Sequence, residues 1–141
     1  MGFRVKVEGA ESIDLNIESI ETVEFKTDTP NDSNARSTDL GTTLEITGKI
    51  LTPVNGEAAD TTIKLAQWSL VPAEKADCYR NVKVDVISAS QIVRQFTLPN
   101  AFVVKYEEDF GDVEGVGTFK LYVKQKKDKT AGVKFEGGFA E

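Results

Sequence analysis

The strongest constraint on the fold of this chain is a repeated alternation of apolar and charged residues. In FRVKVEG, Phe3, Val5 and Val7 are apolar and the residues between them are charged. IDLNIES, whose apolar series extends to Ile17, ETVEFKTD and TLEITGKI alternate in a similar way. Because successive side chains of a β-strand point to opposite faces, this pattern is typical of strands with one buried face. The first 50 residues therefore predict four half-buried strands.

The second half of the chain repeats the pattern. VKVDVIS, QIVRQFTL, AFVVKYEEDF and TFKLYVKQKK alternate, and GVKFEGGF predicts a short last strand. Pro99-Asn100 predicts a turn after QIVRQFTL, and the glycine-rich segment after Phe110 predicts a long hairpin. In the first half, Gly48 occupies a position where the series requires an apolar side chain. We expect a bulge or a close backbone approach at Gly48.

One helix, over about residues 60–71, is predicted between the two groups of strands. Asp60-Thr61 offers an N-cap, and Pro72 ends the helical pattern. Its apolar face is predicted to contain Ile63, Ala66 and Leu70, widened by Leu65 and Trp68. Residues 1–141 thus predict one mainly β domain, a barrel or sandwich of about eight or nine antiparallel strands with one α-helix.

Composition excludes several classes of site. The chain has no histidine, so a Ser-His-Asp or Cys-His arrangement and a histidine zinc site cannot form. Its single cysteine, Cys78, cannot form an intrachain disulfide and is expected to be an inert thiol. A net charge of −6 with one short basic run argues against nucleic-acid binding. We expect no cofactor, no metal, no membrane span and no signal peptide, and therefore a cytoplasmic protein or one assembled into a virion or tail-like particle.

An acidic cluster near the predicted hairpin turn is the first candidate for chemistry. It contains Glu107, Glu108, Asp109, Asp112 and Glu114. Paired carboxylates can hydrolyse glycosides or bind calcium. Neighbours in a strand point to opposite faces, however, so Glu107 and Glu108 should not converge. The pattern favours a solvated or interface role for this cluster.

The polar stretch TDTPNDSNARSTDLGTT, residues 27–43, is the second candidate. Counted from Asp28, Pro30 and Ser33 stand where a calcium-binding EF-hand loop needs an oxygen ligand and glycine, and Asp39 stands where it has glutamate, so the pattern argues against calcium. Arg36 is its only cation between the predicted strands and is flanked by Asp32 and Asp39. These three residues predict either a local ion pair or a contact between subunits.

The long hairpin carries opposite charges at its two ends. Carboxylates gather at the turn, and Lys124, Lys126, Lys127 and Lys129 gather at the far end. A subunit polarised in this way suits head-to-tail association. A solvated hairpin with accidental charge asymmetry explains the pattern equally well.

The order of elements resembles the tail-tube family. The segments that carry the resemblance are TLEITGKI, TTIKLAQWSL and NVKVDVISASQIVRQFTLPNAFVVKYEEDFGDVEGVGTFKLYVKQKKDK. The family includes phage tail-tube proteins and the haemolysin-coregulated tube protein of type VI secretion. Some small phage-like tail proteins that the last segment resembles carry a "membrane-associated protease" label. The residues give no support for proteolysis, since no nucleophile has a histidine base.

The resemblance implies a non-catalytic subunit that forms a ring, typically a hexamer, and stacks head to tail into a tube. It implies that the sheets of neighbours join into an inner barrel, that the 27–43 loop reaches a neighbour, and that an acidic lumen would suit the conduit. Sheath and baseplate proteins are further candidate partners. The interface residues expected are Asp32, Arg36, Asp39, Glu107, Glu108, Asp112, Glu114, Lys124, Lys126 and Lys127.

Two other functions remain open from the sequence. A monomeric β-sandwich that binds carbohydrate or protein would need an exposed aromatic platform, and few aromatic residues lie outside alternating strand positions. A carboxylate-dependent hydrolase would need a second acidic group across a cleft from residues 107–114.

Overall fold

The chain folds into strands and one short helix, as the alternation predicts. The computed structural model describes residues 1–28, 41–50, 62–72, 74–111, 117–125 and 134–137. Its elements are β1 (Gly2–Glu8), β2 (Ile13–Leu15), β3 (Ile20–Asp28), β4 (Gly41–Ile50), α2 (Ile63–Ser69), a 3-10 helix η1 (Ala76–Cys78), β5 (Arg80–Ser88), β6 (Gln91–Phe110), β7 (Gly117–Gln125) and β8 (Lys134–Gly137). The predicted mainly β class is confirmed, with eight strands and one α-helix in the part of the chain that the structure describes.

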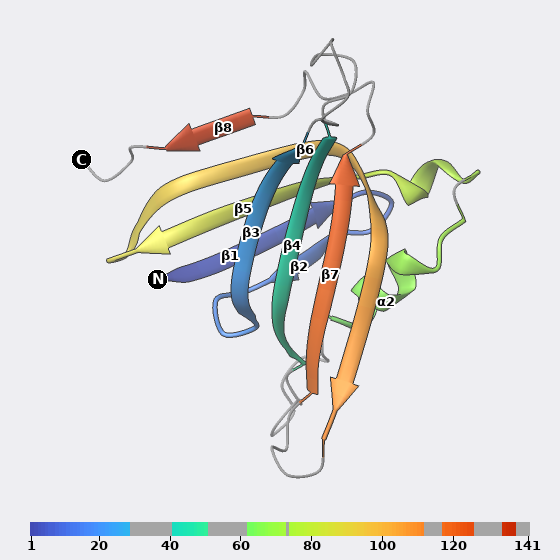
Figure 1. The fold of residues 1–141 in the computed structure, drawn as a ribbon, viewed down its shortest axis with the longest axis horizontal. Helices are drawn as coiled ribbons and strands as arrows, with labels where there is room; N and C mark the ends of the chain where they lie inside the picture. The colour runs from blue at the N-terminus through green and yellow to red at the C-terminus, as the bar shows by residue number, and fades with distance from the viewer. Residues whose placement is uncertain (29–40, 51–61, 73, 112–116, 126–133, 138–141) are drawn as a thin grey trace.

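The strands form an open antiparallel sheet folded into two layers (Figure 1). The strand order is β2-β1-β5-β6-β7-β4-β3, and β8 also pairs with β6. One layer contains β2, β1, β5 and the first half of β6; the other contains the second half of β6, β7, β4 and β3. The helix α2 packs against β6, and no element lies over the outer face of the β7–β4–β3 layer in Figure 1.

The strand β6 passes from one layer to the other, so the turn predicted at Pro99-Asn100 is wrong. Before this point β6 pairs with β5, and after it with β7. Asn100 has a left-handed backbone, with φ of 56°, and its N–H donates to Asn81 Oδ1 at 3.3 Å. The Pro99 carbonyl accepts a hydrogen bond from Gln125 Nε2 at 2.7 Å. Residues typical of a turn thus form a corner within one long strand.

The core lies between the two layers and contains the inward residues of the alternating strands. Val5, Val7, Val82 and Val84 come from the back layer, and β4 and β7 contribute the facing residues. The other fully enclosed apolar residues include Ile13, Leu15, Leu44, Ile46, Leu65, Trp68, Leu98, Phe119, Leu121 and Val123. Burial of these side chains is the main stabilising term of the fold.

Gly48 confirms the expected close backbone approach. The register of β3 against β4 shifts between Ile20 and Thr22, beside Gly48. A Cβ atom at Gly48 would collide with the Ser19 carbonyl oxygen and would lie 2.7 Å from the Phe119 ring. The same carbonyl accepts the Lys49 N–H at 2.7 Å. Only glycine leaves room for this bulge.

The burial predicted for Ile17 is wrong. The strand predicted over residues 13–19 ends at Leu15, because a turn begins at Asn16, whose carbonyl accepts the Ser19 N–H at 3.0 Å. Ile17 is therefore 47% exposed instead of buried.

The helix is also shorter than predicted and is rotated relative to the predicted face. It is capped at Thr62, with no side-chain hydrogen bond, whereas the predicted cap at residues 60–61 lies outside the described residues. Leu65 and Trp68 point into the core, while Ile63 and Leu70 are 58% and 81% exposed. Leu65 and Trp68 are three residues apart and therefore share one face of the helix, which packs toward β6.

Candidate assembly surfaces

The predicted hairpin places Glu107 and Glu108 on opposite faces of β6, as expected for strand neighbours. Glu107 lies opposite Lys120 in the ladder and forms an ion pair with Lys105 at 3.3 Å. Glu108 lies opposite Phe119 and accepts a hydrogen bond from Tyr106 Oη at 2.7 Å. The two carboxylates do not form a pair that could act on one bond.

The charge separation along this hairpin is less complete than the sequence pattern predicts. Lys124 lies at the base, opposite Phe102, away from the carboxylates near the tip. Lys105 and Lys120, however, lie in the acidic half. The other predicted interface residues lie outside the described residues: Asp32, Arg36, Asp39, Asp112, Glu114, Lys126 and Lys127.

Two long strand edges lack a partner among the described strands. β3 pairs with β4 on one side only, along nine residues. The second half of β6, from Phe102, pairs with β7 on one side, while β5 ends opposite Ala101. Unpaired backbone groups at such edges are able to add another strand. The four strands β6, β7, β4 and β3 thus form a block with a free edge on each side.

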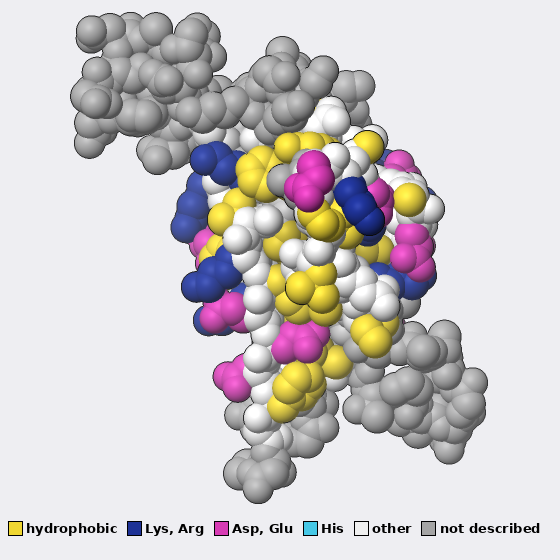
Figure 2. Space-filling model, turned by 90° about the vertical axis from the view of Figure 1, so that its right-hand side faces the viewer, with side chains coloured by type: hydrophobic (Ala, Val, Ile, Leu, Met, Phe, Trp, Pro, Cys, Tyr) yellow, Lys and Arg dark blue, Asp and Glu magenta, His cyan; other side chains and the backbone are white. Residues whose placement is uncertain are grey.

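Exposed apolar side chains lie along the side of the molecule formed by β6 and α2. Val104 and Phe110 of β6 are 57% and 65% exposed, and Ile63 and Leu70 of α2 are exposed as well. From this side, hydrophobic side chains run down the middle of the surface with lysine and arginine along one margin (Figure 2). Exposed apolar groups beside an unpaired strand edge are typical of a surface that a partner covers.

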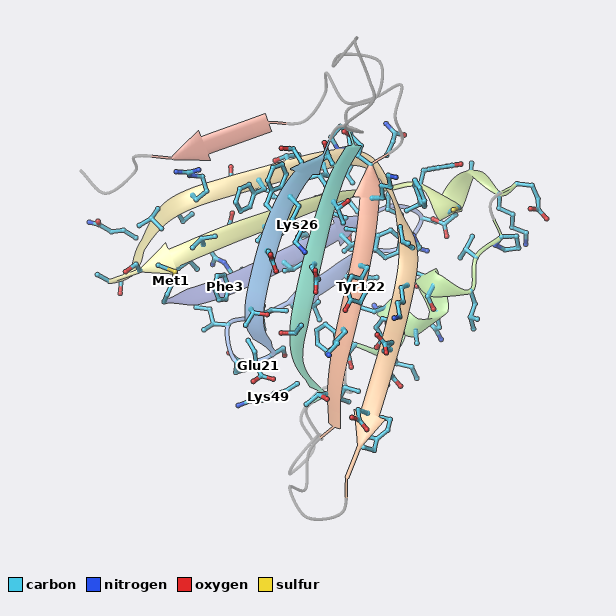
Figure 3. The ribbon with its side chains drawn as sticks, in the orientation of Figure 1. Met1, Phe3, Glu21, Lys26, Lys49 and Tyr122 are labelled. Carbon is cyan, nitrogen blue, oxygen red and sulfur yellow. The ribbon has the colours of Figure 1, made fainter. Side chains whose placement is uncertain are left out.

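The uncovered face of the β3–β4–β7 layer is polar and carries charges of both signs. Lys26 Nζ lies 3.2 Å from Glu45 and 3.5 Å from Glu24. The hydrogen bond to Glu45, together with the charges of both glutamates, raises the pKa of Lys26. Lys26, Lys49 and Tyr122 lie on this face in Figure 3. Such pairs add little stability at a surface but keep the face hydrated.

A buried arginine links the helix region to the first hairpin. Arg80 is only 6% exposed, and its Nη2 donates to Asp77 Oδ2 at 2.6 Å. Its Nε contacts both the carboxylate and the main-chain carbonyl of Asp77, and its guanidinium lies 5.4 Å from the Trp68 ring centroid. The arginine stem also fills the space beside Gly9. We call Arg80, Asp77 and Trp68 the arginine clasp.

The clasp sets the ionisation of its neighbours. Hydrogen bonds from Arg80, and from the Ala10 N–H at 3.1 Å, hold the pKa of Asp77 below its ordinary value. Burial raises the pKa of the Cys78 thiol, while the charge of Arg80 acts in the opposite direction. A thiol with a raised pKa is a poor nucleophile at neutral pH. The contacts of the clasp join η1 and the start of β5 to α2 and to the turn after β1.

Among the described residues, no three cysteine or acidic side chains lie close enough together to hold a metal ion. No described helix has the length and apolarity needed to cross a bilayer.

Sequence reasoning missed both the clasp and a basic cluster on the back layer. Lys6 of β1 and Lys83 of β5 are directly paired, with Arg4 on the same face. The signal was present, because both strands contain VKV with charged outward positions. The sequence does not show that β1 pairs with β5, and only this pairing brings Lys6 and Lys83 together.

Comparison with known proteins is informative only at the level of the fold. No protein-family model and no curated protein sequence matches the chain. Hcp1 from Flavobacterium johnsoniae superimposes with a TM-score of 0.56 at 16% identity, covering 98% of this chain and 97% of that one. Another Hcp protein has a TM-score of 0.56 at 11% identity, with 98% and 100% covered.

Components of contractile injection systems share the same fold. A chain of the anti-feeding prophage baseplate has a TM-score of 0.55 at 15% identity, covering 96% of this chain and 93% of that one. A chain of the sheath–tube complex of an extracellular contractile injection system has a TM-score of 0.52 at 12% identity, with 97% and 89% covered. The protein therefore has, over nearly its whole length, the fold of the Hcp tube proteins and of these injection-system components.

Proposed function

We propose that the protein is a structural subunit that assembles with copies of itself into a ring or tube of a phage tail, a phage-derived particle or a contractile injection apparatus. The observation that carries the proposal is the match to Hcp proteins and injection-system components over nearly the full length of both chains. The proposed role is non-catalytic, and the subunit works inside an assembled tail-like particle.

The geometry of the free edges supports assembly through a continuous sheet. In the block β6-β7-β4-β3 each neighbouring pair is antiparallel, so β3 runs opposite to β6. A neighbour generated by rotation about an axis along the strands keeps the same strand direction. Its β6 would therefore run antiparallel to β3 of the first copy, and the hydrogen-bonded ladder can continue between subunits.

The same geometry defines which face of the block would line the ring. Six copies, as in the six-fold symmetrised baseplate, would give a barrel of about 24 strands, with a circumference of about 115 Å and a radius of about 18 Å. The second layer lies about 10 Å from the first. Six such layers cannot fit inside at a radius of about 8 Å, so the uncovered face of the block would line the lumen.

The described part of this face carries charges of both signs in similar number. In regular register it carries five lysines and five carboxylates, so charges of the two signs balance. The residues are Lys26, Lys49, Lys105, Lys120, Lys124, Glu24, Asp28, Glu45, Glu107 and Asp109.

The proposal is tested by measuring assembly. Size-exclusion chromatography with light scattering and negative-stain microscopy of the purified chain should show rings or stacked rings. Val104→Lys places a charge at the free edge of β6 and should reduce assembly, whereas Ile17→Lys, on an exposed residue beside β2, should not. A monomer at high concentration that remains monomeric with sheath and baseplate proteins of its own gene cluster would refute the proposal.

A second variant tests the contribution of the 27–43 stretch. Replacing residues 29–40 by a short Gly-Asn turn should preserve the β signal in circular dichroism and weaken the oligomer. Unchanged assembly would remove this stretch, with Asp32, Arg36 and Asp39, from the proposed interface.

A further inference from the structure

A basic cavity lies on the back layer, on the side away from the core. Its volume is about 210 Å3, and its charged lining consists of Arg4, Lys6, Asp14, Lys83 and Asp85. These side chains come from three adjacent strands, β2, β1 and β5. With three cations and two carboxylates, the lining carries one net positive charge. We call it the β1–β5 cavity.

Two lysines in the β1–β5 cavity are direct neighbours across the sheet, and Asp14 of β2 lies opposite Lys6 on its other side. Lys6 and Lys83 are direct partners across β1 and β5, and like charges directly opposite one another destabilise a ladder. Lys6 forms one ion pair, with Glu8 at 3.5 Å, in which both side chains are about half exposed. Among the described residues Lys83 has no ion pair, although the chain as a whole is acidic. An anion placed between the two ammonium groups would remove their repulsion.

The arginine of the cavity is also accessible to a ligand. Gln95 Nε2 holds Asp85 by a hydrogen bond of 2.7 Å. Arg4 contacts the other oxygen of Asp85 at 3.4 Å, and its side chain remains 49% exposed. A contact of this length leaves most of the guanidinium donors available, and a guanidinium binds carboxylates in a bidentate manner.

An apolar residue stands beside these cations. Ile17 is 47% exposed, and its side chain lies 3.0 Å from the position that a Cβ atom on Gly2 would occupy. Gly2, Arg4 and Lys6 alternate along one face of β1, so Ile17 borders the same face as the cations. An apolar contact surrounded by charged groups is the usual composition of a protein interface.

We propose that the β1–β5 cavity binds an acidic segment of the protein that encloses the assembled tube, with carboxylates between Lys6, Lys83 and Arg4 and an apolar side chain on Ile17. This inference rests on the proposed function, because the back layer faces outward only if the uncovered face of the block lines the lumen. One of the similar structures is a chain of a sheath–tube complex. The cavity is separate from the free edges of β3 and β6, so occupation does not compete with ring formation.

The test is peptide binding to the full chain, measured by fluorescence anisotropy. The probe is a fluorescein-labelled peptide with the sequence EDLEDE, and its uncharged counterpart QNLQNQ is the control peptide. EDLEDE should bind, and raising salt from about 50 mM to about 300 mM should weaken it several-fold, because salt screens surface charges. The double variant Lys6→Gln/Lys83→Gln should weaken binding by about three- to tenfold. Lys49→Gln/Lys120→Gln removes the same charge from the other layer and should change binding less than about twofold.

Each outcome separates the cavity from the assembly. Equal weakening by both double variants, or equal binding of both peptides, would overturn the proposal. Light scattering on the same samples should show that Lys6→Gln/Lys83→Gln assembles as the unmodified chain does. If the chain stays monomeric while EDLEDE binds at Lys6 and Lys83, the site is supported and the tube assignment fails. If rings form and EDLEDE does not bind, the cavity proposal alone fails.

Discussion

The arginine clasp gives the most direct test of how the fold is stabilised. Asp77→Asn keeps the size of the side chain and removes the negative charge that faces Arg80. Arg80 is 6% exposed, so its guanidinium would remain desolvated and would face only neutral acceptors, the main-chain carbonyl of residue 77 and the amide oxygen of the new side chain. Leaving a buried charge unpaired costs stability because the charge cannot regain its water.

The size of the effect follows from the contacts that are lost. Complete loss of a buried partner costs about 3–5 kcal/mol, and a hydrogen bond to a charged group contributes about 1.5–3 kcal/mol. The Asp77 side chain is 33% exposed, so solvent already screens part of the interaction. We expect Asp77→Asn to lower the free energy of unfolding by about 2 kcal/mol, which shifts the urea midpoint by about 1 M at an m value of about 2 kcal/mol/M.

The loss should also depend on pH in a defined direction. Arg80 holds the pKa of Asp77 below its ordinary value, so the stability from its ionisation is fully present above that value. It is lost as the pH falls from about 4 through the pKa of the folded state. The difference between the unmodified chain and Asp77→Asn should therefore be constant from about pH 6 to 8 and shrink below about pH 4.

Two further variants complete this test, with urea unfolding followed by circular dichroism at low protein concentration. Glu24→Gln removes an exposed carboxylate near Lys26 and should change stability by less than about 0.5 kcal/mol. Asp77→Asn/Arg80→Met removes both charges and should be less destabilised than the sum of the single variants. If Asp77→Asn behaves like Glu24→Gln, or the double variant is additive, the buried pair does not stabilise the fold and our reasoning is refuted.

Three shorter predictions follow from packing. Gly48→Ala should destabilise the fold by about 2 kcal/mol or more in thermal melts, because the added methyl group meets a backbone oxygen; Gly111→Ala, with no heavy atom within 4 Å, should be nearly neutral. Leu65→Ala should cost about 2–5 kcal/mol and Leu70→Ala less than about 0.5 kcal/mol, and the reverse order would contradict the observed helix face. Cys78 should react with iodoacetamide more slowly than a free thiol at pH 8.5 until urea unfolds the chain, because burial raises its pKa; equal rates would contradict this account.

The faces of the strands could be predicted from the sequence because alternation is a local property. Val5, Val7, Val82 and Val84 are buried as the period-two pattern requires, since each strand must bury one face whatever its partners are. Gly48 was predictable for the same reason, as a gap in a regular series.

Other features depend on contacts between distant segments. Pro99-Asn100 carries the chemistry of a turn, and only pairing with β5 and then β7 makes it a corner. Leu65 and Trp68 form one helical face and Ile63 and Leu70 another, and the position of β6 selects between them.

The surfaces were harder to predict than the core. An arginine in sequence is normally exposed, and the burial of Arg80 follows from Trp68 and Gly9, which are far away along the chain. Strand alternation correctly predicted that Glu107 and Glu108 lie on opposite faces. It could not predict that Lys105 and Lys120 lie beside Glu107, because those contacts depend on the pairing of β6 with β7.

The passage of β6 through both layers has a mechanical consequence. A pulling force on the hairpin tip is carried along one covalent strand into the ladder with β5. Ladder hydrogen bonds lie across the strands, so a pull along β6 loads many of them at once instead of opening them one after another. The two layers cannot be peeled apart without tearing β6 from β5 or from β7. In the proposed tube, an axial load would therefore be carried by the backbone. Each subunit would connect the inner layer to the outer layer through the one continuous strand β6.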